Sequence, residues 1–336
     1  MSKTVDEIGL AVIGCGTIGR IRAEFARDYP GVKWLGLCDI KEDLGKNLAA
    51  DAKADFFTTN FEELITRSEV NAVMIITEEN KHTEPTLLAV ERGHKLFIEK
   101  PLATEARESA EILRAITDAG VDAVVGYTQR FRRRFLTVKE RLIQGQIGEV
   151  HSVVTRALMN RMVPIATIAK TNERHNLTPM VVSGTHSLDM SMWLLEGKKP
   201  VSVYAKSVDK VLSEWGTKDS TFGIFTFEDG TIFSMNISWS LPVVWPGSVY
   251  GLDPDTGKIL WSNSISGGGT QGGVHFGMAS EGKTVYVPIN DMKNTLDGKV
   301  WLNRKPGMHS LDAETGNIIW SNITDKECKD IDFNCD

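Results

Sequence analysis

The first third of the chain alternates short apolar runs with longer segments of helical periodicity. The apolar runs are "IGLAVIGCG", "VKWLGLCDI", "NAVMIIT", "KLFIEKP" and "DAVVGYT". Between them, "IGRIRAEFARDY" can place Ile18, Ile21, Phe25 and Ala26 on one helical face, and "EPTLLAVERG" and "ARESAEILRAITDAG" are also helical. Strand and helix alternating at this rate predict βαβ units, a parallel sheet and a doubly wound α/β domain.

The pattern changes after residue 126. "RFRRRFLTVKERL" predicts an amphipathic helix whose apolar positions are Phe131, Phe135, Val138 and Leu142, with its arginines mostly facing solvent. "VSVYAKS", "TFGIFTFEDG" and "TIFSMNISWSLP" alternate as strands, and Asp229-Gly230 provides a tight hairpin turn. A second, α+β domain with a mostly antiparallel sheet packed on helices is expected.

An internal repeat occupies the C-terminal part of the chain. "VYGLDPDTGKILWSN" (residues 249–263) aligns with "MHSLDAETGNIIWSN" (residues 308–322), and Leu, Asp, Thr, Gly, Ile, Trp, Ser and Asn recur in register. A repeat this close predicts two β-units of a repeat architecture. The expected organisation is therefore a doubly wound α/β domain (1–126), an α+β domain (127–251) and a β-rich tail (252–336).

Composition excludes several classes of protein. The 336 residues, 41% hydrophobic and 24% charged, are ordinary for a soluble protein with two domains. A net charge of −6 argues against a nucleic-acid or anionic-membrane partner. The start lacks the features of a signal peptide and no apolar run approaches membrane length, so the cytoplasm is expected. The four cysteines suggest no disulfide framework, and no metal site is predicted.

Three glycines carry the first candidate chemistry. Gly14, Gly16 and Gly19 form G-x-G-x-x-G between the first strand and its helix. The first permits a tight turn, the second lets the backbone approach a pyrophosphate, and the third lets the helix pack on the strand. The amino end of that helix, with Thr17 and Ile18, would face the phosphates.

Asp39, at the end of the second strand, is the expected partner of the ribose. A carboxylate there accepts hydrogen bonds from both hydroxyls of NAD and repels a 2′-phosphate. NAD is therefore the expected cofactor, although Ile40 and Lys41 leave NADP open. The alternative is a structural turn followed by a capping aspartate.

Two loops extend this motif into a family resemblance. "ITEENKHTEP" contains Thr77, Asn80 and His82, and "FIEKPLA" contains Glu99-Lys100-Pro101. Together with "GYTQRF", "GEVHSV" and "GTHSLDMSMWLLEG", they make roughly residues 7–251 resemble the glucose–fructose oxidoreductase / inositol dehydrogenase (Gfo/Idh/MocA) family. The resemblance implies that Thr77, Asn80, His82, Glu99, Lys100 and Arg130 belong to the cofactor site.

The same resemblance implies catalytic roles for Lys100 and His186. Lys100 closes a parallel strand at its carboxyl end, where its ammonium can hydrogen-bond a substrate hydroxyl oxygen. His186 matches the family histidine that takes the proton of that hydroxyl. Asp189 is expected to orient or cap, and it is also a candidate for substrate contact. Many members carry an aspartate where this chain has Val182, so the familiar Lys–Asp–His trio is incomplete.

Substrate recognition is expected in the segment from Met159 to Asn176. Its Asn160, Arg161, Arg174 and His175 could bind a polyol, sugar or acid from a loop over the pocket, or could belong to a solvated loop. The family resemblance also implies that residues 1–126 are a dinucleotide-binding domain and that 127–251 are a substrate and oligomerisation domain, truncated relative to family members. It implies homo-oligomer contacts through the sheet of this second domain.

The tail resembles tryptophan-docked β-propeller blades of quinoprotein (pyrroloquinoline quinone, PQQ) dehydrogenases, so the chain has the appearance of a fusion. A propeller closes with about four to eight blades, and residues 252–336 suffice for no more than two. PQQ is therefore an unexpected cofactor. The tail is expected to pack poorly or to fold as a small separate β-unit.

Three functions follow. The first is an NAD(P)-dependent oxidoreductase acting on a secondary alcohol of a sugar, cyclitol or related hydroxy compound. The second is a nucleotide-binding protein without turnover, which Val182 permits. The third, a quinoprotein dehydrogenase, conflicts with the number of blades.

Overall fold

The structure is a computed structural model that describes residues 7–161, 168–169, 176–241, 248–266, 274, 278–289 and 305–324, without the side chain of Asn160. The chain divides into two compact units, Met1–Ala157 with Thr171–Ser238 and Leu158–Lys170 with Trp239–Asp336. None of the described helices is both long enough and apolar enough to cross a membrane.

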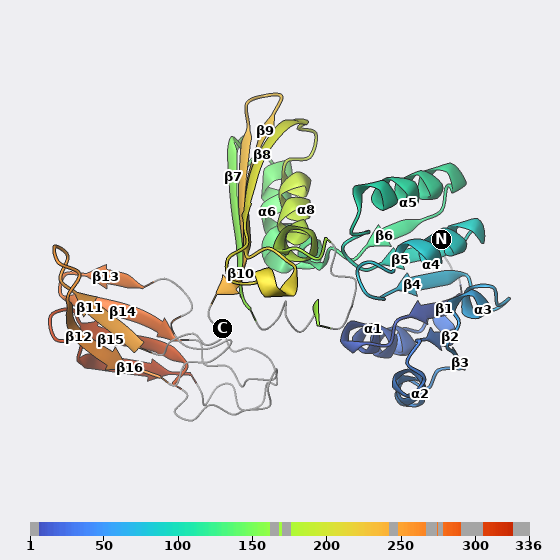
Figure 1. The fold of residues 1–336 in the computed structure, drawn as a ribbon, viewed down its shortest axis with the longest axis horizontal. Helices are drawn as coiled ribbons and strands as arrows, with labels where there is room; N and C mark the ends of the chain where they lie inside the picture. Colours follow the sequence, from blue (N-terminus) through green and yellow to red (C-terminus); the bar gives the residue numbers. More distant parts are fainter. Residues whose placement is uncertain are drawn as a thin grey trace. The chain divides into compact units, whose positions relative to one another are not determined.

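A six-stranded parallel sheet forms the N-terminal part of the molecule (Figure 1). Its strand order is β3-β2-β1-β4-β5-β6, which confirms the predicted doubly wound α/β fold. The strands are β1 (Ile8–Ile13), β2 (Val32–Cys38), β3 (Phe56–Thr58), β4 (Ala72–Ile75), β5 (Lys95–Ile98) and β6 (Ala123–Val125). The helices between them are α1 (Thr17–Asp28), α2 (Glu42–Asp51), α3 (Phe61–Ile65), α4 (Thr83–Glu91) and α5 (Ala106–Ala119).

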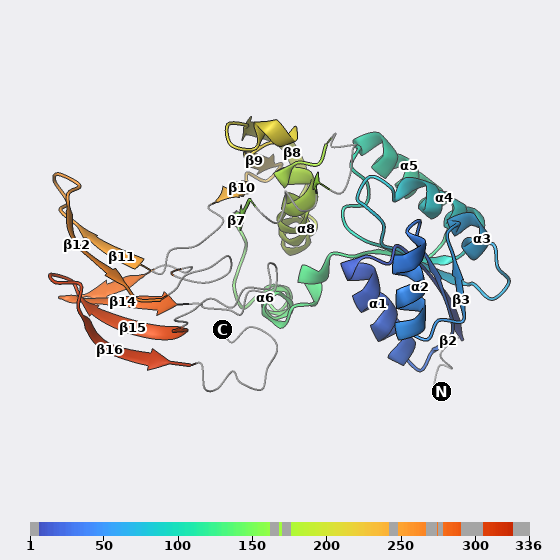
Figure 2. The same cartoon turned by 60° about the horizontal axis from the view of Figure 1, so that its bottom comes forward.

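Helices cover both faces of this sheet (Figures 1 and 2). Ala11 and Ile13 of β1 belong to one buried cluster with residues of α3, α4 and α5. Leu10 and Val12 of the same strand belong to a second cluster with residues of α1 and α2. The strand is therefore buried on both sides, as its uninterrupted apolar run indicates.

The predicted apolar face of α1 was right for Ala26 and wrong for its larger residues. Ile18 is 48% exposed and Phe25 76% exposed. The helix buries its small residues, Ala26 together with Gly19 and Ala23. The reason is close approach, because a Cβ on Gly19 would lie 1.9 Å from the Gly14 carbonyl oxygen.

The second sheet has the strand order β7-β10-β9-β8. Its strands are β7 (Ser152–Asn160), β8 (Pro200–Val208), β9 (Ser220–Phe227) and β10 (Ile232–Leu241), and β9 pairs antiparallel with β8 and β10 as expected. Phe233, Met235 and Ile237 of β10 form its core with Leu195, which follows α8 (Thr185–Leu194). Before α8 lie the short helix η1 (Thr128–Phe131), α6 (Arg133–Ile143) and the π-helix η2 (Pro179–Gly184), and η3 (Ser213–Trp215) precedes β9.

Helix α6 is present but buries none of its described side chains. Phe131, which was assigned to its apolar face, is 70% exposed, and Val138 is 37% exposed. The helix is held instead through Lys139, whose ammonium donates to the Trp193 carbonyl oxygen (2.6 Å) and pairs with Glu196 (2.8 Å).

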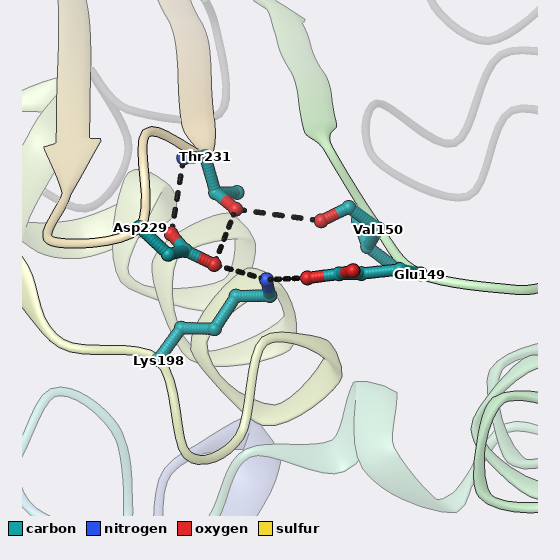
Figure 3. Close-up of polar contacts among 5 residues, drawn as sticks. All are labelled: Glu149, Val150, Lys198, Asp229 and Thr231. Atoms are coloured by element: carbon teal, nitrogen blue, oxygen red, sulfur yellow. Dashed lines mark hydrogen bonds and ion pairs between the residues drawn. The ribbon is translucent and has the colours of Figure 1, made fainter.

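A polar network holds the predicted hairpin between β9 and β10 (Figure 3). Gly230 adopts φ +85°, and the Asp229 carboxylate accepts from the backbone N–H of Thr231 (3.0 Å) and from Lys198. Lys198 also reaches Glu149 (3.1 Å), so it joins this hairpin to the approach to β7. The Lys198 ammonium, with the Thr231 bonds, lowers the pKa of Asp229 to about 2.

The tail contains two small sheets that share one core. The hairpin of β11 (Ser248–Leu252) and β12 (Ile259–Ser264) forms one sheet. The other has the order β13 (Ala279–Glu281), β14 (Thr284–Ile289), β15 (Gly307–Asp312), β16 (Ile318–Ile323). Residues from both sheets form a buried cluster of Val249, Ile265, Val287, Ile289 and Leu311. The described part of the tail thus has a small packed core.

Candidate active site

The glycine turn after β1 leaves open space above the start of α1. Gly14 adopts φ +100°, and a Cβ there would lie 2.3 Å from the Ile76 carbonyl oxygen, so only glycine fits. Among the described residues, nothing lies within 4 Å of the position of a Cβ on Gly16. The first turn of α1 has no acidic residue and no side-chain cap, and Thr17 is exposed. Free N–H groups beneath open space suit an anionic pyrophosphate.

Asp39 follows β2 directly and is fixed by two main-chain bonds. Its Oδ2 accepts from the Cys15 N–H at 2.7 Å, and its Oδ1 accepts from the Lys41 N–H at 2.8 Å. The bond from Cys15 ties the carboxylate to the glycine turn. Ile40 beside it is 86% exposed. A half-buried carboxylate anchored at this edge of the sheet is positioned to accept ribose hydroxyl groups.

His82 connects the loops that follow β4 and β5. Its side chain is 1% exposed, its Nδ1 donates to the Pro101 carbonyl oxygen at 2.8 Å, and its Nε2 lies 3.4 Å from the Thr77 carbonyl oxygen. Burial lowers its pKa, which favours the neutral ring. The structure thus places His82 inside the protein as a brace between two loops, with Thr77 and Asn80 half-buried in the first of them.

Glu99 is held from three directions. Arg22 of α1 donates to its Oε1 from Nη2 (2.7 Å) and Nε (3.2 Å), and the Lys100 N–H donates to its Oε2 (3.2 Å). A Cβ on Gly126 would lie 2.9 Å from the same Oε2. Arg22 was not identified from the sequence, because nothing in the helical pattern indicates which cation faces a glutamate so far along the chain.

Lys100 reaches the second domain through a main-chain oxygen. Its Nζ donates to the Val182 carbonyl oxygen at 3.2 Å. Val182 itself is 8% exposed and lies in η2, directly before α8. The lysine therefore keeps a polar contact at the position where many Gfo/Idh/MocA members carry a carboxylate.

His186 stands beside this lysine. Burial, and then the positive charge of Lys100, lower the pKa of His186, so its ring is neutral at neutral pH. Its Nδ1 is buried and makes no hydrogen bond within the described parts of the chain. The ring of Tyr127 meets it edge-on at 6.4 Å, and the Tyr127 hydroxyl hydrogen-bonds Thr185 Oγ1 at 2.8 Å. Tyr127 is a second residue that sequence reasoning missed.

Asp189 pairs with Arg130 in this structure. Arg130 donates from Nε to Oδ2 (2.8 Å) and from Nη2 to Oδ1 (2.5 Å), and the Asp189 side chain is 7% exposed. The pair raises the pKa of Arg130 and links η1 to α8. The partner of Asp189 in the structure is thus Arg130, the residue expected near the nicotinamide.

For most of the substrate candidates, the structure describes no side chain. Arg174 and His175 lie outside the described residues. Asn160 ends β7, and the backbone N–H of Arg161 donates to the Leu241 carbonyl oxygen at 3.3 Å. Of the five substrate candidates, only Arg161 and Asp189 have described side chains.

Three family models match this chain, and the first two agree with the observed fold. Residues 8–127 match the family described as "Oxidoreductase family, NAD-binding Rossmann fold", and residues 135–251 match the "GFO/IDH/MocA C-terminal domain". Residues 246–331 match a PQQ-type model described as "Outer membrane protein assembly factor BamB". The last match overlaps the second one, as expected if the chain changes family near residue 250.

Individual relatives of this chain are also oxidoreductases. An uncharacterized oxidoreductase, YrbE, of Bacillus subtilis is 25% identical over 67% of this chain and 65% of its own length. Inositol 2-dehydrogenase of Gluconacetobacter diazotrophicus is 31% identical over 57% of this chain and 55% of its own length. This chain thus spans less than two thirds of either relative.

A solved structure shares the fold over most of this chain. Scyllo-inositol dehydrogenase from Lactobacillus casei, with bound NAD(H) and scyllo-inositol, superposes with a TM-score of 0.63 at 18% identity. The match covers 71% of each chain.

Proposed function

Residues 8–251 belong to the Gfo/Idh/MocA family of oxidoreductases, and from this premise we propose that the chain is an NAD-dependent dehydrogenase. It would transfer a hydride between a secondary alcohol of a cyclitol, sugar or related polyol and the nicotinamide. The observation that carries the proposal is the contact of Lys100, at the carboxyl end of β5, with the Val182 carbonyl oxygen, which lies four residues before His186 of α8.

The residues that would hold the cofactor fit it. The uncapped start of α1 and the open space at Gly16 accommodate a pyrophosphate, and anchored Asp39 accepts the ribose hydroxyls. Glu99, fixed by Arg22, lies next to Lys100 in the same loop. When bound, NAD supplies the hydride acceptor.

The protein groups would handle the proton. Lys100 would donate a hydrogen bond to the substrate hydroxyl oxygen and stabilise the negative charge that develops on it. The neutral ring of His186 would accept the hydroxyl proton, because its lowered pKa keeps it unprotonated. The Val182 carbonyl would hold the lysine side chain in place while it does so.

Binding without turnover is the alternative, and Val182 is the observation that favours it. A carbonyl cannot accept and release a proton as a carboxylate can, so the site lacks one ionisable group. In that case the chain would bind the nucleotide and turn over no substrate.

One experiment separates the two functions. Purified chain is incubated with a panel of cyclitols, sugars and polyols, with NAD and NADP in parallel, and reduction is followed at the nicotinamide absorbance. Reduction with one compound class, lost in Lys100→Ala, supports the dehydrogenase. Calorimetric binding of NAD with no reduction on any compound supports the binding protein.

A further inference from the structure

The two repeats of the tail have the same backbone, turn by turn. In each hairpin an aspartate Oδ1 accepts from a threonine N–H: Asp253 from Thr256 at 2.7 Å, and Asp312 from Thr315 at 2.8 Å. The glycine that follows is left-handed in both, at φ +68° for Gly257 and +72° for Gly316. Strand register also matches, including the irregularity after Gly251 and after Ser310.

The second turn is a docking site for the tryptophan of the first repeat. Trp261 donates from Nε1 to the Ala313 carbonyl oxygen at 2.9 Å, and Asn263 donates to the Gly316 carbonyl oxygen at 2.7 Å. A Cβ on Gly316 would lie 2.3 Å from the Trp261 ring, so the ring packs directly on glycine. Gly316 is buried by this contact.

The corresponding groups at the two outer ends of the unit remain exposed. Trp320, the counterpart of Trp261, is 44% exposed and lies beside Tyr286 at 6.3 Å on its own sheet. Gly257, the counterpart of Gly316, is exposed, and no described atom lies within 4 Å of its Cβ position. The tail thus presents one tryptophan and one matching turn, each equivalent to half of a contact already formed inside it.

We propose that Trp320 of one chain docks on the Asp253–Lys258 turn of a second copy of this chain. The occupant is argued from the molecule itself, because the Trp261 contact shows what each half binds. In the docked pair, Trp320 Nε1 would donate to the Pro254 carbonyl oxygen. The side-chain amide of Asn322 would donate to the Gly257 carbonyl oxygen. Residues 254, 257 and 322 correspond to 313, 316 and 263 in the internal contact.

The contact is head-to-tail, so it repeats. A heterologous interface closes into a ring or continues as an open chain. If each repeat hairpin takes one blade position, a closed ring of about four to eight positions would need two to four chains. Each chain would contribute its tail to the ring and carry its own dehydrogenase part.

Full-length variants remove one half of the contact at a time. Trp320→Ala removes the docking ring. Gly257→Asn fills the turn while keeping the left-handed backbone, because asparagine tolerates that conformation. Gly282→Asn is the matched control, since Gly282 is also left-handed (φ +57°) with open space around its Cβ position, but lies in the turn between β13 and β14.

Sedimentation velocity over a wide range of concentration gives the readout. The wild type and Gly282→Asn should form larger species as concentration rises, and Trp320→Ala and Gly257→Asn should not. A mixture of the two defective variants should recover one junction per pair, because each supplies the half that the other lacks. Any association through the second-domain sheet would be the same in all of these variants, so it does not affect the comparison between them.

Residue-level oxidation by hydroxyl radicals, read by mass spectrometry, locates the contact. Oxidation of Trp320 should fall with concentration in the wild type and stay constant in Gly257→Asn. Equal sedimentation of wild type and both variants would overturn the proposal. So would protection of Trp320 at every concentration, which would show that the chain itself or a co-purified protein covers it.

Discussion

At the residue scale, Lys100 owes its contact with the second domain to a main-chain oxygen. The Val182 side chain contributes no polar atom, yet its carbonyl accepts from Lys100 Nζ at 3.2 Å. A backbone acceptor positions the ammonium regardless of the residue type at 182. Substitution of an expected aspartate by valine therefore removes a titratable group but retains the position of the lysine.

The lysine itself can be tested directly. Lys100→Ala should lower turnover by more than about 100-fold, equivalent to about 3 kcal/mol of barrier, because the substrate oxyanion loses its donor. The dissociation constant of NAD, measured by calorimetry, should change little. Turnover within a few-fold of the wild type would remove Lys100 from the mechanism.

The pH dependence should follow His186. Its pKa is lowered, first by burial and then by Lys100, so protonation occurs below the ordinary value of about 6.5. Substrate oxidation should therefore be constant around neutrality and fall as pH drops below that value, when the ring can no longer accept a proton. In His186→Gln this acidic limb should disappear together with most activity.

An independent readout is an NMR titration of the His186 ring in the absence of substrate. Removing the Lys100 charge should raise the measured pKa of His186, because the nearby cation disfavours the imidazolium. An unchanged value in Lys100→Ala would show that the two side chains do not interact.

Asp39 should govern the choice of cofactor. Asp39→Ala should weaken NAD binding by about 1.5–3 kcal/mol, the usual loss for hydrogen bonds to a charged group, and narrow the preference over NADP. Because Asp39 also accepts from Cys15 N–H, Asp39→Asn is the control that keeps an acceptor for the turn while removing the charge. If neither substitution changes the ratio of the two affinities, the ribose assignment is wrong.

The position of a single residue along the fold was easier to predict from the sequence than its contact with a distant residue. Gly14, Asp39 and Lys100 are recognisable because each stands at the end of a strand, and strand ends meet at one edge of a parallel sheet. Tyr127 and Arg22 were missed because their partners, His186 and Glu99, are distant along the chain. Contacts of that kind depend on how elements pack, which local periodicity does not encode.

At the scale of elements, the helices show the same limit. Their positions followed from periodicity, but the buried face of α1 did not. Apolar character favoured Ile18 and Phe25, whereas close approach to β1 selected Gly19 and Ala23, which lie against the strand. Steric fit outweighed hydrophobicity there, because a larger side chain would separate helix and sheet.

Close packing of α1 also brings Arg22 to Glu99, and this link can be tested. The two side chains are only 29% and 12% exposed, so Arg22→Ala should leave Glu99 half-buried without its cation and cost about 1–2 kcal/mol of stability. Glu99 adjoins Lys100, so the KM for NAD should rise and kcat should fall.

The controls separate this positioning role from general destabilisation. Arg22→Lys keeps the positive charge but cannot donate two hydrogen bonds to Glu99 as the guanidinium does. Compared with Arg22→Ala, it should therefore recover stability more fully than turnover. Arg20→Ala removes an exposed cation of the same helix, which pairs with Asp51, and should leave kinetics unchanged. Equal kinetics for Arg22→Ala and wild type would contradict the role.

At the scale of the whole molecule, the chain joins two families with different means of stability. The Gfo/Idh/MocA part has a sheet buried on both faces. The PQQ-like tail relies on one small cluster and on Trp261 docked between its repeats. The sequence identified both families, but it left open whether the tail packs, because that depends on the match between a tryptophan and a turn elsewhere in the chain.

This difference predicts how the chain responds to protease. Cleavage should begin between Pro246 and Gly273 and leave an N-terminal core that still binds NAD, since Gly14, Asp39 and Lys100 all precede the cut. Inside that window, Val249 and Ile265 are buried, so the β11–β12 hairpin should itself resist cleavage. Trp261→Ala should remove this protection, because loss of a packed tryptophan costs about 3–5 kcal/mol when fully buried and somewhat less here.

Mass spectrometry of the fragments and calorimetry of the core with NAD provide the measurements. Cleavage spread evenly along the chain, or a core that loses NAD binding when the tail is released, would mean that the two parts depend on each other to fold.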